Sequence, residues 1–507
     1  MSSDRTLRLY NTLSHAVEPV EPIEPGHLRF YSCGPTVYTY AHIGNFRSFL
    51  TADLIARTAA AIGWDTTFVS NITDVGHLTQ DDLVDPSGED KMTAALEREG
   101  ARFANIYDLA RFYTEAFLDD WRALNLRMPD VQPRATEHVT PQIKAVEQLV
   151  EKGHAYETDQ GVYFAVESFP DYGKLSGNRS AEDLEAGVRE ELIDDPDKRD
   201  PRDFALWKKD PDHLMQWHSP WGWGFPGWHI ECSVMSAEYL GAHIDLHAGG
   251  EDLIFPHHEC EIAQAESLSD DGEPFARTWV HTRFLQVEGE KMSKSKGNFF
   301  TVRDLIEPEA EGGRGIDPLA LRYTLLSGQY RKPFNFTKKT LKDSAQMVRR
   351  YQDAAALVED ALERDTDGDD HLGDRLRDIY ARTLDAMCDD LNTPQALAVA
   401  HEGVKLIHSL KGDLNAASAQ SAQRWLKQTN ALLGVIWPEY DGEAAPHDDA
   451  ESDPLAEKVE ALIEERAQAR ADGNYDRADA IRDELDAMGI EVMDSAEGTT
   501  WRKKIDV

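Results

Sequence analysis

Cysteine is scarce in this sequence: four residues in 507 are too few for a fold stabilised by disulfides. The chain also lacks the roughly 18 uninterrupted apolar residues of a membrane-spanning helix, and its first 25 residues contain no apolar signal core. Disorder is excluded too, because 41% of the residues are hydrophobic, including 11 Trp and 18 Phe. We therefore expect a folded, reduced, cytoplasmic protein with three or four domains, from the usual size of roughly 100–200 residues each.

Positively charged residues are also few: the chain has 53 Lys and Arg against 93 Asp and Glu, which gives a net charge of −40. By simple electrostatics such a chain repels nucleic acid. One interpretation is an acidic surface that maintains solubility. The other is adaptation to concentrated salt, since at 1 M the screening length is about 3 Å and self-repulsion largely vanishes. Because the excess is spread along the whole chain, we favour a halophilic source, and local basic sites then indicate partners better than net charge does.

Hydrophobic patterning predicts a parallel sheet at the start of the chain. Strand patterns at 27–33 and 64–71 flank a helical pattern at 46–62, which together form a β-α-β unit. Further strand patterns follow at 243–248 and 279–287, and the chain is mostly helical from about 312 onward. The predicted fold class is α/β, with a Rossmann-like parallel-sheet domain, an inserted subdomain and helical C-terminal domains.

Changes in pattern along the chain predict the domain boundaries. The Rossmann-like domain is expected in two halves, separated by a mixed insertion. An acidic, proline-containing linker separates off the last module. The predicted segments are 1–120 and 226–311 for the two halves, 121–225 for the insertion, 312–385 for a helical junction, 386–437 for a helical bundle, 438–454 for the linker and 455–507 for the C-terminal module.

A mixed set of metal-binding side chains is scattered along the chain. His257 and Glu261 are four residues apart, so they share one face of a helix. Cys33 follows a predicted strand, where open α/β sheets bind ligands, and Cys232 begins a predicted helix. Together they could bind zinc through sulfur, nitrogen and oxygen. The spacing alone is weak support, since there is no CxxC pair, and a buried cysteine is usually a small hydrophobic residue; we interpret Cys260 and Cys388 in that way.

Two short motifs are suited to phosphate. The turn His42-Ile43-Gly44-Asn45 leads from the first strand into a helix, whose N-terminus attracts anions. Three lysines fall within six residues at 291–296, beside Gly297. In so acidic a chain, this compact cationic loop favours a polyphosphate ligand. A solvated surface loop and an ordinary helix start are the alternative interpretations.

These motifs resemble those of a known family. The turn at 42–45 is similar to HIGH, and 291–295 reads KMSKS; both are signatures of class I aminoacyl-tRNA synthetases. Other stretches resemble the cysteinyl-tRNA synthetases within that class, and they extend over the whole chain. They are 31–49, 71–74, 174–177, 227–233, 247–264, 284–298, 317–331 and 498–503.

The resemblance implies a zinc site formed by Cys33, Cys232, His257 and Glu261, one ion per chain, that binds the thiolate of the substrate cysteine. The chemistry is reasonable, because a pocket that reads shape alone separates near-isosteres such as cysteine and serine by only about 10²-fold. A soft metal prefers sulfur to a hydroxyl. Selection could then succeed without an editing domain.

The resemblance also implies a two-step reaction: ATP and cysteine, with Mg²⁺, form cysteinyl-adenylate and pyrophosphate, and the tRNA 3′ end then accepts the acyl group. HIGH is here HIGN, and Asn45 keeps a hydrogen-bond donor but cannot carry the positive charge of a histidine. The implied catalytic residues are His42, Asn45, Lys291 and Lys294. ATP binding adds Thr36, Gly44, Gly249, Gly250 and Asp252. The implied amino-acid pocket contains Thr73, Trp228 and His247.

Recognition of tRNA is implied for the helical regions. Segment 312–385 would contact the stem, 386–437 would bind tRNA and 455–507 would read the anticodon. Basic residues interleaved with aromatic ones suit unpaired bases; the implied anticodon residues are Arg470, Tyr475, Asp479 and Trp501. A solvated, charge-rich helix is the alternative. We expect a monomer.

Three rival functions are compatible with parts of the sequence. A ligase that joins cysteine to an amino sugar would share the adenylation core and the zinc site but should lack the C-terminal module. A noncatalytic paralogue that binds tRNA or zinc should have lost His42, Lys291 or Lys294, and all three are present. An acidic structural protein would leave the coincidence of motifs unexplained.

Overall fold

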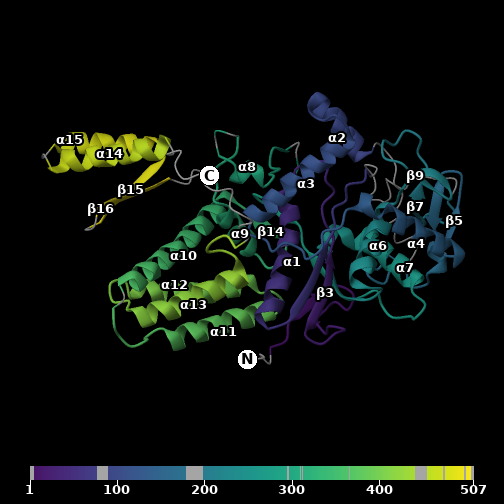
Figure 1. The fold of residues 1–507 in the computed structure, drawn as a ribbon, viewed down its shortest axis with the longest axis horizontal. Helices are drawn as coiled ribbons and strands as arrows, with labels where there is room; N and C mark the ends of the chain where they lie inside the picture. The colour runs from purple at the N-terminus through teal and green to yellow at the C-terminus, as the bar shows by residue number, and fades with distance from the viewer. Residues whose placement is uncertain are drawn as a thin grey trace.

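A four-stranded parallel sheet is the centre of the computed structural model, with strand order β11–β10–β3–β4 (Figure 1). Helix α1 (Ile43–Ala61) connects β3 to β4, which confirms the predicted Rossmann-like α/β class. The strands are β3 (His27–Ser32), β4 (Asp65–Ser70), β10 (Ile244–Gly250) and β11 (Ala276–Thr282). The structure describes residues 5–76, 90–178, 198–293, 296–308, 310, 312–364, 366–439, 454–471, 474–495 and 498–503.

Burial explains the sheet and its first helix. In β3, Leu28, Phe30 and Tyr31 are all completely buried, as expected of a parallel strand covered on both faces. Helix α1 contains no proline, and the only glycine lies at its second position, so nothing interrupts it over 19 residues. Its side chains are buried on nearly every side. The predicted strand–helix–strand unit therefore forms the core of the molecule.

The prediction of a single strand over 279–287 is wrong. Strand β11 ends at Thr282, and β12 (Leu285–Val287) pairs instead with β14 (Phe334–Phe336) and with β13 (Glu290–Lys291). The Arg47 guanidinium donates to the carbonyl oxygens of Arg283 and Phe284, which turns the backbone out of the central sheet between the two strands. A sequence pattern cannot show a break that is imposed by an arginine 236 residues away.

An insertion separates β4 from β10 in the sequence and lies on one side of the sheet (Figure 1). Its five-stranded antiparallel sheet has the order β5–β6–β7–β9–β8. Helix α6 then returns the chain to β10. The elements between β4 and β10 are α2 (Lys91–Glu99), α3 (Ile106–Ala123), α4 (Val139–Glu151), β5 (Ala155–Glu157), β6 (Gly161–Phe164), β7 (Phe204–Lys208), β8 (Trp217–Ser219), β9 (Gly222–Pro226) and α6 (Trp228–Leu240). Helix α7 (Glu259–Leu268) follows β10.

The C-terminal third is helical and lies on the opposite side of the sheet from the insertion (Figure 1). The α14–β16 module stands apart from the bundle α10–α13. Most of the predicted linker, 440–453, is outside the described residues, and α11 runs through the predicted boundary at 385/386. The elements are α8 (Arg303–Ile306), α9 (Pro318–Leu326), α10 (Lys338–Arg364), α11 (Gly373–Cys388), α12 (Thr393–Ser409), α13 (Ala416–Leu433), α14 (Pro454–Ala471), α15 (Tyr475–Ala487), β15 (Ile490–Ser495) and β16 (Gly498–Lys503).

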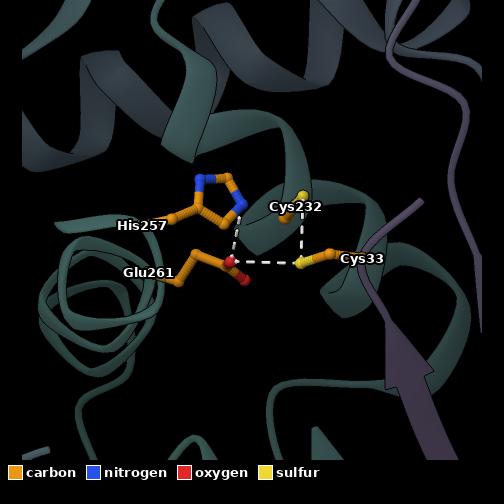
Figure 2. A group of neighbouring side chains, drawn as sticks. All are labelled: Cys33, Cys232, His257 and Glu261. Atoms are coloured by element: carbon orange, nitrogen blue, oxygen red, sulfur yellow. Dashed lines mark hydrogen bonds and ion pairs between the residues drawn. The ribbon is translucent and has the colours of Figure 1, made fainter. Parts of the chain in front are cut away.

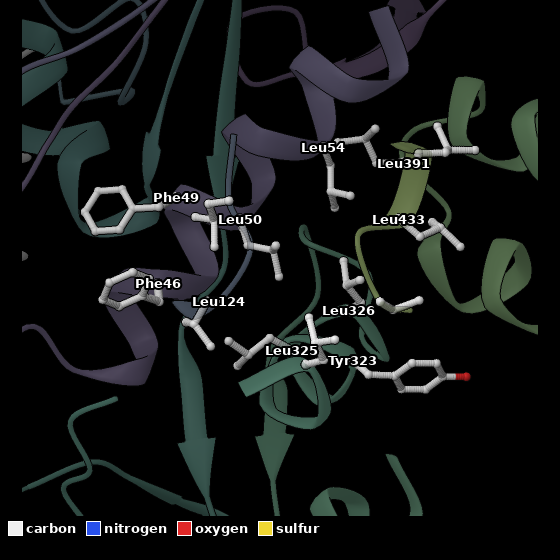
Figure 3. Packing of buried hydrophobic residues seen from close by; sticks show 14 of the residues in the cluster. Phe46, Phe49, Leu50, Leu54, Leu124, Tyr323, Leu325, Leu326, Leu391 and Leu433 are labelled. Atoms are coloured by element: carbon white, nitrogen blue, oxygen red, sulfur yellow. The ribbon is translucent and has the colours of Figure 1, made fainter. Parts of the chain in front are cut away.

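Apolar side chains of α1 join the sheet domain to the helical region. Leu50 and Leu54 project from α1 toward buried leucines of α9 and of the bundle, whereas Phe46 and Phe49 point the other way and pack against Phe117 and Trp121 of α3 (Figure 3). Burial of apolar surface contributes about 25 cal/mol per Å². This contact therefore stabilises the packing of the sheet domain against the helical region. Among the described residues, no helix has the length and apolar character needed to cross a membrane.

A buried ion-pair group lies at the same junction. Asp53 of α1 accepts hydrogen bonds from Arg57 Nε at 2.9 Å and from an Arg322 terminal nitrogen of α9 at 2.6 Å. Arg322 also donates to the carbonyl oxygens of Leu433 and Asn125. Three elements distant in sequence thus share one set of hydrogen bonds with almost no exposure to solvent.

Candidate active site

Four side chains from three separate parts of the chain meet at the carboxyl end of the central sheet (Figure 2). The Sγ atom of Cys33 lies 4.0 Å from Cys232 Sγ and 3.7 Å from Glu261 Oε1. His257 Nε2 lies 3.0 Å from the same Oε1. One atom from each residue falls within 4.8 Å of the others, and all four residues are buried. The structure therefore brings together the four residues predicted as metal ligands.

The local secondary structure positions each of these four candidate metal ligands. Cys33 directly follows β3, and its N–H donates to the carbonyl of Ala248 on β10 at 3.2 Å. Cys232 lies in the second turn of α6. His257 precedes α7 and Glu261 lies in its first turn, so their four-residue spacing directs both side chains to one face.

The cluster contains strongly perturbed ionisable groups. A hydrogen bond with Cys33 lowers the pKa of the Cys232 thiol to about 7, although burial opposes it. Burial, together with Cys232, raises the pKa of the Cys33 thiol well above its ordinary value. Burial lowers the pKa of His257, but the Glu261 carboxylate and Cys232 outweigh it and raise that pKa to about 10. Burial likewise opposes ionisation of Glu261, yet His247 and His257 lower its pKa to about 2.

This donor set fits a zinc ion. Two thiols, an imidazole and a carboxylate are all zinc ligands, and tetrahedral bonds of about 2.0–2.3 Å place ligand atoms roughly 3.3–3.8 Å apart. The corresponding distances here are 3.0–4.0 Å. The cysteines are free thiols. A second set, Cys33, His247, His258 and Glu261, meets the same distance criterion, so His258 is an alternative nitrogen ligand.

Further histidines surround the cluster. His247, predicted for the amino-acid pocket, is completely buried, and its Nε2 lies 2.9 Å from Glu261 Oε2. Its ring stacks on Trp279 with centroids 4.6 Å apart. On the other side, His229 Nδ1 lies 2.9 Å from His257 Nδ1. The histidines therefore hold both the carboxylate and the imidazole of the cluster in place.

His258 and His281 form a second layer behind Cys33. The Nε2 of His258 lies 3.3 Å from Cys33 Sγ, and its Nδ1 lies 2.8 Å from His281 Nε2. Burial, with the other histidines, lowers the pKa of His258 well below its usual value, and burial lowers that of His281 to about 3. Sequence analysis missed these two residues and His229, because a histidine's role here depends on contacts with residues more than 20 positions away.

The predicted pocket residues Thr73 and Trp228 lie beside the cluster. The Trp228 ring, half-buried at the start of α6, is 4.2 Å from the ring of His257. Thr73 is buried, pairs with Thr36 in a parallel bridge, and donates its hydroxyl to Glu231 Oε2 at 3.0 Å. Burial raises the pKa of Glu231 well above its ordinary value. Sequence analysis missed Glu231, although it directly precedes Cys232.

The HIGN motif caps α1. His42 Nδ1 accepts a hydrogen bond from the Asn45 N–H, and Asn45 Oδ1 accepts one from the His42 N–H, both at 3.2 Å. This is a capping box, formed here by a histidine and an asparagine. Asn45 therefore has a clear role in starting the helix, and its side chain is exposed at the helix N-terminus.

The two signature motifs touch each other. A Cβ atom on Gly44 would lie 2.9 Å from Met292 Cε, so a side chain at position 44 would displace the methionine of the KMSKS loop. Ile43 N–H donates to the Phe300 carbonyl at 3.1 Å, just beyond that loop. Lys291 is exposed at the end of β13. Lys294 lies outside the described residues.

The glycines after β10 make close backbone contacts. A Cβ atom on Gly249 would lie 2.6 Å from a ring carbon of His258, and one on Gly250 would lie 2.3 Å from Asp252 Oδ1. Position 249 therefore excludes a side chain, whereas one at position 250 would displace the carboxylate of Asp252. The two glycines leave the backbone bare at the carboxyl end of β10, next to the four-residue cluster.

The 174–177 motif of the insertion binds the carboxylate of Glu259. Its two carboxylate oxygens accept backbone hydrogen bonds from the segment 173–176 at 2.8–3.1 Å. Lys174 adds an ion pair with Glu266 at 2.6 Å. The insertion is thus fastened to the helix that carries Glu261.

The predicted anticodon residues lie in the separate C-terminal module. Arg470 at the end of α14, and Tyr475 and Asp479 on α15, are exposed, Tyr475 to 66%. Trp501 lies on β16, where its backbone pairs with Val492 of β15. The side chain of Trp501 is outside the described part of the structure.

Comparison with family models gives three matches in chain order. Residues 19–346 match the model described as the catalytic domain of class I (C) tRNA synthetases. Residues 383–437 match the DALR domain, and residues 452–502 match the cysteinyl-tRNA ligase anticodon binding domain. Together they cover most of the chain.

Similar sequences and structures agree with these matches. A curated cysteine–tRNA ligase of Salinibacter ruber is 68% identical over 99% of both chains. Another, from Geobacter sulfurreducens, is 42% identical over 98% of this chain and 100% of its own. Methionyl-tRNA synthetase of Mycobacterium tuberculosis, solved with methionyl-adenylate, has a TM-score of 0.56 at 15% identity and covers 82% of this chain and 92% of its own. At that identity the similarity shows the fold alone.

Proposed function

This chain belongs to the class I cysteinyl-tRNA synthetase family, and we propose that a zinc ion held by Cys33, Cys232, His257 and Glu261 gives it its specificity for cysteine. As a cysteine–tRNA ligase it uses cysteine, ATP and tRNA. The observation that carries the zinc proposal is the convergence of two free thiols, an imidazole and a carboxylate within 4.8 Å. When bound, the ion would supply a thiophilic Lewis acid that prefers the substrate's sulfur to the hydroxyl of serine.

The surrounding side chains would bind and orient cysteine and the nucleoside. Trp228 packs over His257 beside the cluster, and Thr73 donates to Glu231, which directly precedes Cys232 on α6. Gly249, Gly250, Asp252 and Thr36 would contact the nucleoside of ATP, because the bare backbone at the two glycines permits close approach.

The signature motifs would bind the phosphates. His42, Asn45 and the first amides of α1 form an electropositive helix start, and Gly44 leaves it open to an anion. Lys291 and Lys294 would neutralise the pyrophosphate that leaves with Mg²⁺ as the cysteine carboxylate attacks the α-phosphorus. In the second step a hydroxyl of the tRNA 3′-terminal ribose attacks the acyl carbon, and AMP leaves.

Assignment of the tRNA contacts rests on the matches to the two C-terminal models. Arg470, Tyr475, Asp479 and Trp501 would read the anticodon by hydrogen bonding and stacking. Segment 386–437 would bind tRNA and 312–385 its stem, in a cytoplasmic, monomeric enzyme.

The direct test is attachment of cysteine and of serine to unfractionated tRNA, together with metal analysis of the purified protein. We expect one zinc per chain and attachment of cysteine only. Loss of cysteine attachment after chelation, with recovery on adding zinc, would support the metal's role. Serine attachment at a comparable rate, or full activity without zinc, would refute it.

The charge of −40 predicts a dependence on salt. If the source is halophilic, attachment of cysteine and the thermal unfolding midpoint should both rise from dilute buffer to multimolar KCl, because screening removes carboxylate repulsion. The unfolding midpoint is measured in KCl and in sucrose as a nonionic control. Highest activity and stability in dilute buffer would overturn the halophilic interpretation and leave the function intact.

Replacing His42 should impair adenylate formation. We expect His42→Ala to lower the rate of cysteine-dependent ATP–pyrophosphate exchange about 10²–10³-fold, the usual effect of removing one transition-state donor. Loss of the helix cap should cost only about 1 kcal/mol of stability. His243, which is partly buried, pairs with Asp271, and His243→Ala serves as the control. An unchanged exchange rate in His42→Ala would contradict the assignment.

A further inference from the structure

A line of hydrogen bonds connects the N-terminal hairpin, β1 (Arg8–Asn11) and β2 (Ala16–Pro19), to the metal cluster. The Thr12 Oγ1 atom lies 2.7 Å from His281 Nδ1. His281 Nε2 lies 2.8 Å from His258 Nδ1, and His258 Nε2 lies 3.3 Å from Cys33 Sγ. All four residues are buried, with exposures of 9% or less. Four residues separated by up to 269 positions thus form one continuous path.

The donor and acceptor roles along this path are fixed from one end. A metal-bound cysteine is a thiolate, which can only accept, so His258 must carry its proton on Nε2. A neutral imidazole then has an unprotonated Nδ1, which must accept from His281 Nε2. His281 in turn has an unprotonated Nδ1, and only the Thr12 hydroxyl can donate to it. Each donor meets an acceptor, and no ring nitrogen on the path is left unpaired.

We propose that Thr12, His281 and His258 are positioning residues that orient an N–H toward Cys33 Sγ and so hold this thiolate for the zinc ion; the proposal rests on the proposed zinc function. Partners of this kind fix the tautomer and orientation of groups around a metal. Thr12 precedes the 19–346 region matched by the catalytic family model. The N-terminal hairpin therefore becomes part of the thiol-selecting centre.

The hairpin is rigidly placed for this role. Thr12 N–H donates to the Trp279 carbonyl at 2.8 Å, and Asn11 Oδ1 accepts from the Trp279 N–H at 3.0 Å. Both bonds tie the end of β1 to β11, the strand that carries His281. The hydroxyl of Thr12 is thereby aligned with the imidazole from a fixed backbone.

A competing arrangement uses the same atoms differently. In the second distance-compatible ligand set, His258 would bind the metal directly instead of supporting Cys33. Its Nε2 would then have no proton, and the donor directions along the path could not hold as assigned. Variants at His258 distinguish the two arrangements, because loss of a ligand changes the coordination geometry of the metal, whereas loss of a positioning residue leaves the ligand set in place.

The experiment measures Co²⁺ bound to the full-length protein, through the sulfur-to-cobalt charge-transfer band, the d–d bands and competition with a chelator. We expect His258→Leu to weaken metal binding about 10–100-fold, as loss of such partners does. His258→Gln keeps an N–H donor and should therefore retain part of the metal affinity that His258→Leu loses. Thr12→Val should weaken binding in the same direction by a smaller factor and shift the charge-transfer band, whereas Thr12→Ser should match the wild type.

Thr282→Val is the matched control, because it removes a buried hydroxyl that bonds to Thr51 at 2.8 Å, next to His281 but off the path. It should leave the cobalt spectrum unchanged. Wild-type affinity and spectrum in both Thr12→Val and His258→Leu would overturn the proposal. A loss of tetrahedral d–d intensity in His258→Leu would make His258 a ligand instead. A wild-type protein that binds no metal would refute the proposed zinc function itself.

Discussion

We expect Cys232→Ser to abolish zinc binding and cysteine activation in a protein that remains folded. Cys232 and Cys33 supply the two sulfur donors of the cluster, 4.0 Å apart. A hydroxyl in place of either is a far weaker ligand for a soft metal. Loss of a partner outside the ligand shell already costs about 10–100-fold, so loss of a ligand should lower cysteine-dependent ATP–pyrophosphate exchange by more than about 100-fold.

The chain contains a matched control for this change. Cys260 is equally buried and lies between Glu259 and Glu261, but its sulfur contacts the Tyr172 hydroxyl at 3.7 Å instead of joining the cluster. Cys260→Ser should therefore retain one zinc per chain and most of the exchange activity. Zinc content is read by metal analysis, and folding by circular dichroism. Full zinc occupancy in Cys232→Ser would contradict the assigned ligand set.

The second large effect is expected on stability, at Asp53. This carboxylate is completely buried and accepts from Arg57, from Arg322 and from the Arg127 N–H. Asp53→Ala would remove the carboxylate that forms an ion pair with the buried Arg322 guanidinium, which costs about 3–5 kcal/mol. Denaturant unfolding should show this loss. The exposed pair of Asp378 with Arg382 is the control, and Asp378→Ala should cost at most about 1 kcal/mol.

The buried carboxylate of Asp53 should also make the stability of the protein depend on pH. Burial opposes ionisation of Asp53, but Arg322 and Arg57 outweigh it and lower its pKa below the ordinary value. A carboxyl whose folded pKa is depressed adds stability above its unfolded pKa of about 3.9 and loses it as pH falls toward the folded value. Wild-type stability should therefore decline more steeply below about pH 4 than that of Asp53→Asn, and parallel declines would refute the prediction.

Much of the architecture follows from the sequence by local physics. A strand pattern, an uninterrupted helix of 19 residues and a second strand predict the β-α-β unit, because alternation and helical periodicity are properties of short segments. The two signature motifs and the ligand types at Cys33, Cys232, His257 and Glu261 are likewise visible in the sequence. Their chemistry depends on residue type, which does not change on folding.

Only the tertiary structure decided how these parts act together. The break after Thr282 depends on Arg47, and His281 finds its hydroxyl partner in Thr12, 269 residues away. No pattern within a segment can encode a partner more than 200 residues away. The sequence by itself determined the fold class, the family and the donor chemistry. Packing determined which histidine faces sulfur, which carboxylate pairs across the domain junction and which cysteine remains a hydrophobic side chain, because burial and hydrogen-bond partners exist only in the folded chain.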